Sequence, residues 1–400
     1  MHCKIHQKEP SLLLKNGRRF EVGHSEFIFT NTIDEVADYW KEFAYGDLFF
    51  SPAFLKVIET SPELGIKPFY VLQMQDGVCK GIFYFQLKYF KLKESLSKKN
   101  ESGLSIKSAL QGLVNFNTLV FGNLLLTGNY GCCNVSDASH NFDWKNFQDQ
   151  LLTILKDHYQ FEPSAILAKD FYDDQIPSHL AGSGFSSFSV QPNMEFYIRE
   201  NWKSFDDYLE DLKAKYRVRY RRALKKADGL HFKALNEHDL MVHQDLMHRL
   251  YTNIAENAAF NLFQLPPDYF LKMKHALGDN FIVHGCFDEH GEMLAFYSCV
   301  NNKDHLQAHF LGYNLEKNEE KQIYLNMLYQ MIELGIKLKQ TKIILSRTAI
   351  EIKSSVGAVP MEMSCMFMHT NAIANRFFGP LFSLYNPTPE EYVIRSPFKE

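Results

Sequence analysis

The strongest constraint on the fold is an order of predicted elements that occurs twice along the chain of 400 residues. In the first half, KPFYVLQMQDGVCKGIFYFQLKYF predicts two strands joined at Asp76-Gly77, because Asp-Gly favours the left-handed backbone of a tight hairpin. A periodic helix at 146–159 and an apolar strand, SAILAKDF, follow. The second half repeats this order, with elements predicted at 281–287, 293–300, 305–313, 321–339 and 342–346. The repeated order predicts two similar α/β domains, although no sequence repeat can be aligned.

The predicted domain boundary lies between residues 194 and 195. A chain of 400 residues is too long for one ordinary core, and its 46% of hydrophobic residues is enough for two. We expect an N-terminal domain over 1–194 and a C-terminal domain over 195–400. Each is expected to be an α/β (α+β) unit with a mixed, mostly antiparallel sheet flanked by helices. A polar, charged stretch at 96–108 predicts a mobile loop between strands of the first domain.

Cysteine usage and hydropathy exclude several classes of protein. The seven cysteines show neither CxxC nor a pattern of zinc ligands, so neither a disulfide framework nor a metal site is predicted. The first ten residues, MHCKIHQKEP, lack the apolar core of a signal peptide. No apolar run approaches the roughly 18 residues that span a bilayer. We expect a cytoplasmic protein that is at most peripheral on the membrane face.

A dense basic segment, KAKYRVRYRRALKK at 213–226, contrasts with the formal net charge of −4. Ser204 and Asp207 resemble a capping box and Gly229 fits a helix stop, so a helix, or two closely joined helices, is predicted at about 205–228. Helical spacing places one apolar stripe on this segment, formed by Leu209, Leu212, Tyr216, Tyr220, Ala223, Leu224 and Ala227. The cations cover the rest of the helix, and those expected to contact a partner are Lys213, Lys215, Arg217, Arg219, Arg221, Arg222 and Lys225.

The spacing of these cations leaves two interpretations open. Lys213, Arg217, Arg221 and Lys225 are successive i,i+4 neighbours without an intervening acid, and such like charges repel one another. The segment is either a solvated face or a docking site for a polyanion, which would offset the repulsion. An acidic carrier protein, a tRNA and an anionic membrane are the candidate partners. The acidic remainder of the chain argues against DNA.

A second polar segment, SRTAIEIKSSVGA at 346–358, begins where the closing strand of the second half ends. Strand ends are where α/β proteins place their sites. Arg347 and Lys353, with Thr348 between them, are predicted to bind an anionic substrate group. Glu351 could orient one of these cations or accept a proton. A structural salt-bridge cluster is the alternative reading.

With these segments in view, the chain resembles the FemAB-like branch of the GNAT N-acyltransferase superfamily, whose members include peptidoglycan biosynthesis or recognition proteins. The resemblance rests on FSPAFLKVIE, FGNLLLTGNYG, KYRVRYRRALKK and SRTAIEIKSSVGA, which occur in the expected order over nearly the whole chain. It implies tandem GNAT-like domains and transfer of an acyl group to an amine. Bacterial ceramide-forming and related aminolipid N-acylating enzymes belong to this broad neighbourhood.

The chain departs from the family at one informative place. GNAT proteins that use acetyl-CoA carry a glycine-rich turn between the third strand and the helix, and its backbone N–H groups bind the pyrophosphate. Here that junction reads LGYNLEKNEEKQIY, with one glycine and several acids. We therefore do not expect free acetyl-CoA to be the acyl donor. A donor tethered to an acidic carrier fits better, and no permanently bound cofactor is expected.

N-acylation from a thioester requires a neutral amine and protonation of the leaving thiolate. His309, in the third strand of the second half, is the candidate base because its unperturbed pKa lies near 6.5. Tyr313, at the end of that strand, is the candidate acid, and His284 is a weaker rival to His309. Structural roles for all three remain alternatives. Cys132 and Cys133 are expected to be structural, and no G-x-S-x-G nucleophile is present.

Taken together, the sequence predicts an N-acyltransferase that uses acyl-ACP or acyl-CoA as co-substrate. The acyl group would pass to the primary amine of a sphingoid or sulfonolipid-like aminolipid, and the 34 phenylalanines suit an apolar acyl tunnel. One alternative is a FemAB-type, aminoacyl-tRNA-dependent peptidyltransferase acting on a cell-wall precursor. Another is a non-catalytic module that binds a lipid or a carrier.

Overall fold

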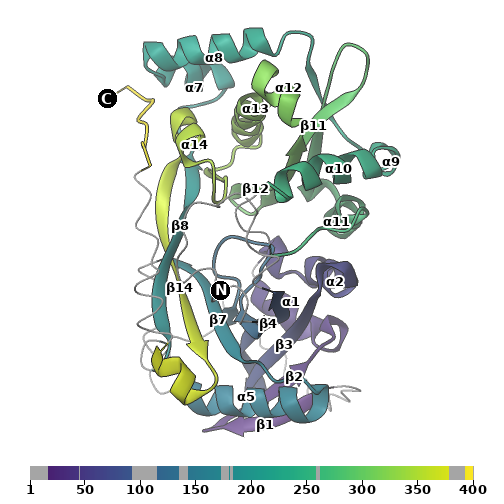
Figure 1. Ribbon diagram of the computed structural model, residues 1–400, viewed down its shortest axis with the longest axis vertical. Helices are drawn as coiled ribbons and strands as arrows, with labels where there is room; N and C mark the ends of the chain where they lie inside the picture. The colour runs from purple at the N-terminus through teal and green to yellow at the C-terminus, as the bar shows by residue number, and fades with distance from the viewer. Residues whose placement is uncertain are drawn as a thin grey trace, which may run out of the picture.

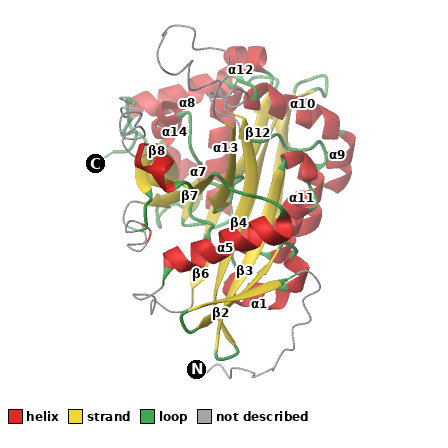
Figure 2. Ribbon diagram, turned by 60° about the horizontal axis from the view of Figure 1, so that its bottom comes forward, coloured by secondary structure: helices red, strands yellow, loops and turns green. Residues whose placement is uncertain are grey.

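One mixed sheet of 14 strands runs through the part of the chain that the computed structural model describes. The described residues are 17–44, 46–91, 115–134, 143–172, 180, 183–257, 262–377 and 392–399. The predicted loop at 96–108 lies outside them. The mixed sheet flanked by helices confirms the predicted fold class (Figure 2).

The first half of the chain contributes strands that form a meander and then a parallel pair. They are β1 (Arg18–Val22), β2 (Ser25–Thr30), β3 (Ile66–Gln75), β4 (Val78–Lys91), β5 (Asn115–Phe121), β6 (Cys132–Asn134) and β7 (Ala165–Tyr172). The predicted hairpin is confirmed, since Gln75 pairs with Val78 and both Asp76 and Gly77 have positive φ.

The remaining strands repeat this arrangement. They are β8 (Ser186–Tyr197), β9 (His231–Ala234), β10 (Phe281–Phe287), β11 (Met293–Asn302), β12 (His305–Tyr313), β13 (Lys342–Ile344) and β14 (Val359–His369). Strands β5 and β7 are parallel in the first half, and β12 and β13 are parallel in the second.

The two halves exchange strands at the centre of the sheet. Its order there is β5-β7-β14-β8-β13-β12, so β14, from the end of the chain, pairs with β7, and β8 pairs with β13. Figure 1 shows β8 and β14 side by side along the length of the molecule, from the half that carries α5 to the half that carries α7 and α8. The predicted boundary at 194/195 falls inside β8, so the division into domains 1–194 and 195–400 stays a prediction while the sheet is continuous across it.

Helices cover both faces of the sheet (Figure 2). They are α1 (Ala37–Ala44), α2 (Pro52–Glu59), α5 (Trp144–Tyr159), α7 (Phe205–Asp211), α8 (Ala214–Lys226), α9 (Glu237–Val242), α10 (Gln244–Ala255), α11 (Tyr269–Leu277), α12 (Leu315–Lys321), α13 (Ile323–Lys337) and α14 (Ile350–Val356). Single 3-10 turns occur at Ile33–Glu35, Leu48–Phe50, Pro62–Leu64 and Gly278–Asn280. Among the described helices, none is long and apolar enough to cross a membrane.

The hydrophobic residues form three clusters, one of which joins the halves. It packs residues from α1, α2 and the 3-10 turn at 48–50 against α10, α11, β10 and β11. A second cluster lies under α13 and α7 in the second half, and a third lies under α5 in the first. The third contains Phe27, Phe83 and Phe147, and it also contains Met366 and Met368 from β14. The end of the chain therefore completes the core of the first half.

The predicted basic helix is two joined helices, α7 and α8. The capping box at Ser204 and Asp207 is present, and Gly229 has φ 81 just beyond α8. The break at Leu212 changes the helical register, so Tyr208 is buried and Leu224, predicted for the apolar stripe, is 54% exposed. Tyr216, Ala223 and Ala227 form the buried side of α8.

Replacing Met366 with Ala should destabilise the core of the first half, although Met366 belongs to the second half of the sequence. We expect the free energy of unfolding to fall by about 2–5 kcal/mol, the usual cost of truncating a buried methionine. Urea unfolding followed by tryptophan fluorescence measures it. Met361→Ala, a half-buried position on the same strand, is the control. Equal, small losses in both variants would contradict the strand exchange.

Candidate functional site

A β-bulge in β7 places two charged residues side by side. Between the pairs Ala168–Met366 and Phe171–Ser364, β7 contributes Lys169 and Asp170 while β14 contributes only Cys365. Asp170 has φ 62, in the left-handed region that non-glycine residues seldom adopt. Bulges re-aim side chains, and they are frequent next to active sites. The bulge therefore turns both charges toward the interior, where Asp170 is fully buried.

The Lys169 ammonium is enclosed by three acceptors. It donates to the carbonyls of Asn123 (3.0 Å) and Leu126 (2.7 Å), and also to the Asp170 carboxylate. Only 7% of the Lys169 side chain is exposed. Burial, followed by the charge of Arg347, lowers the pKa of Lys169 to about 7. A buried amine with a strongly lowered pKa is typical of functional sites, although structural networks also produce it.

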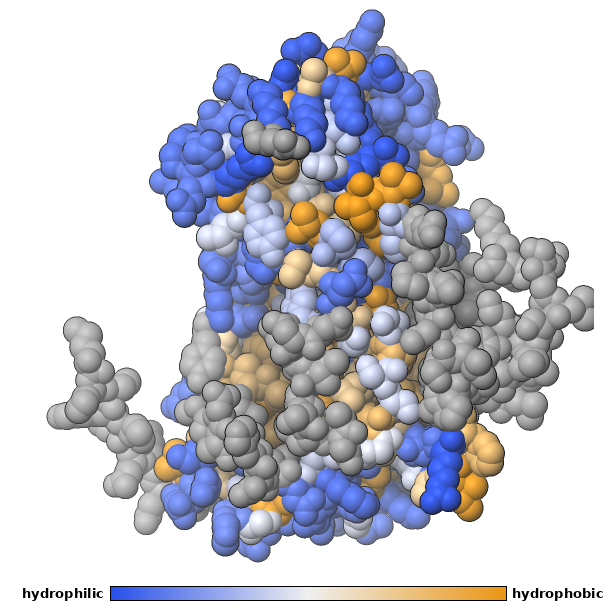
Figure 3. Space-filling model, turned by 90° about the vertical axis from the view of Figure 1, so that its left-hand side faces the viewer, coloured by the Kyte–Doolittle hydropathy of each residue, from blue (hydrophilic) through white to orange (hydrophobic). Residues whose placement is uncertain are grey.

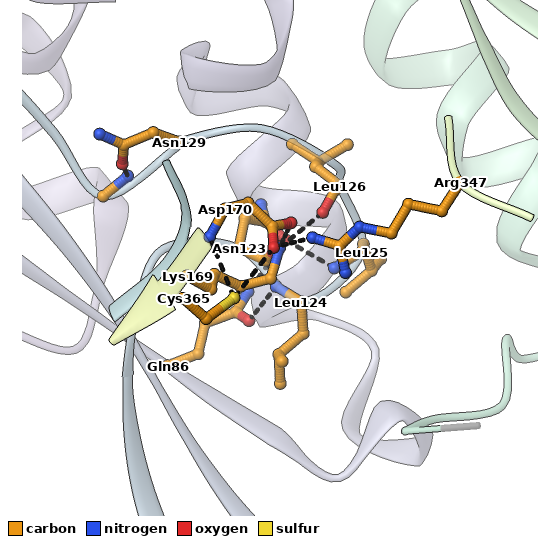
Figure 4. A network of polar contacts seen from close by, with 11 residues as sticks. Gln86, Asn123, Leu124, Leu125, Leu126, Asn129, Lys169, Asp170, Arg347 and Cys365 are labelled. Carbon is orange, nitrogen blue, oxygen red and sulfur yellow. Dashed lines mark hydrogen bonds and ion pairs between the residues drawn. The ribbon is translucent and has the colours of Figure 1, made fainter. Parts of the chain in front are cut away.

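Arg347 joins this pair from the other half of the chain. It lies just after β13, and its guanidinium forms an ion pair with Asp170. The Cys365 thiol donates to the same carboxylate over 3.4 Å. Figure 4 shows Arg347 approaching the Lys169–Asp170 pair from the side opposite the chain that carries Asn129. We call Asn123, Lys169, Asp170, Arg347 and Cys365 the polar junction.

The segment that carries Arg347 has a strained backbone, which is held in place by hydrogen bonds from Lys353. Ser346, Thr348 and Ala349 all have positive φ, a conformation that persists only where surrounding contacts enforce it. The buried Lys353 supplies such contacts, since its ammonium donates to the carbonyls of Ser346 (3.1 Å) and Arg347 (2.5 Å). Burial lowers the pKa of Lys353 to about 7.

The structure therefore gives both predicted anion-binding cations partners within the protein. Lys353 shapes the segment and Arg347 holds Asp170, so their role in binding a substrate stays a prediction. Thr348 is exposed, and Glu351 lies at the surface, where it pairs with Arg395 over 3.6 Å.

A second bulge carries His309. Between the pairs Tyr297–Leu311 and Cys299–Ala308, β12 contributes His309 and Phe310 opposite Ser298 alone. The Ser298 hydroxyl donates to the Phe310 carbonyl (2.8 Å) and accepts from its N–H (3.1 Å). The extra residue reverses which face the following side chains occupy. Tyr313, four residues after His309, consequently packs with Tyr324 in a different hydrophobic cluster, so the predicted base and acid are not brought together.

His309 lies in apolar, aromatic surroundings that oppose its charging. Its ring packs against Phe49, Phe54 and Phe310, and its Nε2 shares a 2.6 Å hydrogen bond with the Tyr269 hydroxyl. The residue as a whole is half-buried, and burial of the imidazole lowers its pKa to about 3. His309 was predicted to be the base because an unperturbed histidine has a pKa near 6.5, and the folded protein does not give it that pKa. Its catalytic role stays a prediction that the geometry does not favour.

A loop from the first half, residues 122–131, connects the two bulges. At one end its Asn123 and Leu126 carbonyls hold Lys169, and a Cβ on Gly122 would lie 2.8 Å from Lys169 Cγ. At the other end, the Tyr130 hydroxyl lies 3.4 Å from Gln307 Oε1 on β12, and its ring packs on Phe49. The loop therefore runs between the ends of the parallel strands of both halves.

The other candidates, His284, Cys132 and Cys133, lie in packed surroundings. His284 stacks on Tyr297 at 5.1 Å, and burial lowers its pKa. Burial raises the pKa of Cys132 to about 12 and that of Cys133 to about 11, which opposes thiolate formation. No group of His, Cys, Asp or Glu residues suited to a metal ion occurs in the described part of the chain.

The cations predicted to dock a partner lie on α8 and at its N-cap, at one end of the molecule. Lys215, Arg221, Arg222 and Lys225 are exposed, and Lys213, Arg217 and Arg219 are partly so. Arg217 donates to the carbonyls of Glu210 and Leu212, which ties α8 to α7. Within the described residues, none of the cations between 213 and 226 forms an ion pair.

Sequence reasoning missed the core of the polar junction. Lys169 and Asp170 lie in SAILAKDF, which was predicted only as a strand. A charged pair inside an apolar strand is the signal that could have identified them, because buried charges require partners. Nearby, Glu195 accepts from Tyr172 (2.7 Å), Tyr197 (2.9 Å) and Lys342 (2.9 Å).

The low pKa of His309 has a consequence for stability. The unfolded chain binds a proton to this histidine below about pH 6.5, whereas the folded protein does so only near pH 3. The free energy of unfolding should therefore fall as the pH drops from about 6.5 toward 3. Urea unfolding of wild type and His309→Phe at pH 7.5, 5.5 and 4.5 should show a smaller loss in the variant. The exposed His238→Phe serves as control, and parallel curves for wild type and His309→Phe would contradict the buried neutral ring.

Comparison with known proteins supports the fold. Neither protein-family models nor curated protein sequences match the chain. Among solved structures, FemX has a TM-score of 0.51 at 14% identity, covering 90% of this chain and all of FemX. A tandem GNAT protein from the clavulanic acid biosynthesis pathway has a TM-score of 0.51 at 8% identity, covering 87% of this chain and 99% of that one. These likenesses show the fold, and they confirm the predicted resemblance to FemAB-like, tandem GNAT proteins at that level.

Proposed function

We propose that the protein is an N-acyltransferase that takes a fatty acyl group from a carrier thioester and transfers it to the primary amine of an aminolipid. Support at the level of chemistry class comes from the tandem GNAT-like fold, which the chain shares with the neighbours above. The observation that carries the proposal further is the row of cations on α8, none of which forms an ion pair within the described residues. An acyl carrier protein is the partner whose acidic surface these cations would match.

In the second half, the parallel strands β12 and β13 stop pairing at the place where a tethered donor would bind. Pairing between the parallel strands β12 and β13 ends at Gln307 and Ile344, whereas β12 continues to Tyr313. The segment that follows β12 does not form a glycine-rich turn. It forms α12, with Glu316, Glu319 and Glu320, directly before α13. Acidic side chains oppose a pyrophosphate at this position, which favours acyl-ACP over free acyl-CoA.

Helix α8 packs against α12 and α13, the two helices that follow β12. The Asn326 amide of α13 donates to the Ala223 carbonyl (3.2 Å), and Lys321 donates to the Asp228 carbonyl (3.1 Å). A cleft of about 280 Å³ lies between α7 and α8, lined by Asp206, Leu209, Glu210, Arg217, Tyr220 and Arg221. Figure 3 shows the hydrophilic surface at this end of the molecule. A carrier bound there would lie beside α12 and α13, the helices that follow β12.

In the proposed reaction, the neutral amine attacks the thioester carbonyl. A C–N bond forms, the C–S bond breaks, and the proton lost by the amine goes to the leaving thiolate. The acceptor is proposed to be a sphingoid or sulfonolipid-like base. Because the pKa of His309 is about 3, the amine would have to arrive deprotonated or lose its proton to water.

Charge reversal on α8 should separate carrier docking from chemistry. Arg221, Arg222 and Lys225 are exposed, so the triple change to Glu leaves the α7–α8 contact through Arg217 intact. We expect KM for acyl-ACP to rise by at least about tenfold while kcat at saturation stays nearly level, because lost ground-state binding raises KM alone. Added salt should act in the same direction, since exposed charges are screened within about 8 Å at physiological ionic strength.

Reversal of Lys67, Lys337 and Lys339 gives the matched control, because it changes the net charge equally at exposed positions away from α8. A short acyl thioester without a carrier should be indifferent to both variants. If the α8 variant has an unchanged KM for acyl-ACP, then α8 is a solvated face and does not dock the carrier. Loss of activity on RNase treatment would point instead to an aminoacyl-tRNA donor, and absence of turnover with every donor would leave a binding module.

A further inference from the structure

Two buried N–H groups of the polar junction lack an acceptor. Within the described part of the chain, neither Asn123 Nδ2 nor Arg347 Nε has a hydrogen-bond partner. Asn123 is fully buried, and both residues contact the same Lys169–Asp170 pair. Unpaired buried donors are rare in folded proteins because each has lost its water without compensation. They therefore indicate an acceptor that the protein itself does not supply.

The orientation of the Asn123 amide is fixed by its neighbours. Its Oδ1 accepts from the Leu125 N–H (3.0 Å) and from Gln86 Nε2 (3.2 Å). Rotating the amide by 180° would place its NH₂ group against these two donors. The NH₂ group must therefore remain where it is, as a donor without an acceptor.

The charge of the junction indicates which acceptor is required. Lys169 and Arg347 contribute two positive charges when protonated, and Asp170 contributes one negative charge. The fourth titratable group in contact, the Cys365 thiol, is neutral because burial raises its pKa. The nearby Glu195 carboxylate is already occupied by Lys342 and two tyrosines. When Lys169 is protonated, one positive charge is thus left over in the junction that contains the two unpaired donors.

We propose that Asn123 and Arg347 form a binding site for a singly charged oxyanion, either a carboxylate or a sulfonate. The Arg347 side chain keeps 27% of its surface exposed although its Nε atom is covered, so an anion would approach the site along this side chain. One oxygen would accept from Arg347 Nε and another from Asn123 Nδ2, while Asp170 keeps its contact with the guanidinium. Arginine is suited to this shared geometry because its five N–H donors lie in one plane.

Under the proposed acyltransferase function, the oxyanion belongs to the acceptor. The polar junction lies at the ends of β7 and β13, while the carrier surface lies on α7 and α8. The acceptor would then be an amine that carries an anionic headgroup, as opposed to a neutral amino alcohol. This assignment rests on the proposed function, whereas the oxyanion site itself does not.

Direct binding of small anions tests the site without any enzymatic assay. Methanesulfonate and acetate are titrated into the full-length protein by calorimetry at constant ionic strength, with dimethyl sulfone as a neutral analogue. Both anions should bind, and the neutral analogue should not. Asn123→Asp keeps the acceptor for Leu125 but replaces the donor with a negative charge, so it should weaken binding by at least about tenfold.

Two further variants keep the test decisive. Arg347→Lys retains the charge and removes the Nε donor, so it should weaken anion binding and would serve if Asn123→Asp failed to fold. Asn301→Asp is the matched control, because its Oδ1 likewise accepts from an amide, that of Gln340 (2.7 Å). It should bind both anions as wild type does. Equal binding by wild type and both junction variants, or none by wild type, would overturn the proposal.

Transfer assays identify the source of the oxyanion. If it is part of the acceptor, methanesulfonate competes with the aminolipid, and Asn123→Asp lowers kcat/KM more for a sulfonate-bearing amine than for its alcohol analogue. Competition with acyl-ACP instead would overturn the assignment to the acceptor. If no amine is acylated while anions still bind, the proposed function fails and the oxyanion site stands.

Discussion

The ion pair between Asp170 and Arg347 is the contact on which the arrangement of the two halves depends. Asp170 is fully buried on β7, and Arg347 follows β13, so the pair joins strand ends 177 residues apart in sequence. A buried carboxylate is tolerated only when cations and hydrogen bonds compensate for lost solvation. Lys169, Arg347 and the Cys365 thiol provide that compensation, and they come from β7, β14 and the segment after β13. The carboxylate therefore requires that both halves and the exchanged strand be in place together.

Local irregularities of the sheet create the chemistry that regular strands would not allow. The bulge at Lys169 and Asp170 turns two neighbouring charges inward, and the bulge at His309 and Phe310 turns two rings toward Tyr269 and Phe49. The loop at 122–131 contacts the first bulge through its carbonyls and contacts β12 beside the second bulge through Tyr130. Lys353 braces the strained segment beneath Arg347. A buried lysine thus donates hydrogen bonds to backbone carbonyls beside each parallel strand pair. Lys169 does so in the first half and Lys353 in the second.

Much of the local structure was predictable because its signals are short-range. The Asp76-Gly77 hairpin, the capping box at Ser204 and the succession of strands and helices along much of the chain all follow from neighbouring residues. The strand exchange was not predictable, since the pairing of β14 with β7 joins segments almost 200 residues apart. The bulges were also not predicted, because the sequence pattern does not show where a strand contains an extra residue. As a result the face of Tyr313, the partners of Arg347 and the low pKa of His309 could be learned only from the structure.

A double-mutant cycle on Asp170 and Arg347 tests the central claim most directly. The free energy of unfolding is measured for wild type, Asp170→Asn, Arg347→Gln and the double variant. If the buried pair joins the halves, each single change should cost about 3–5 kcal/mol. The double variant should then cost clearly less than the sum, with a coupling energy of about 2 kcal/mol or more, in the upper part of the range for residues in one network. Additive losses, with a coupling energy near zero, would contradict the account.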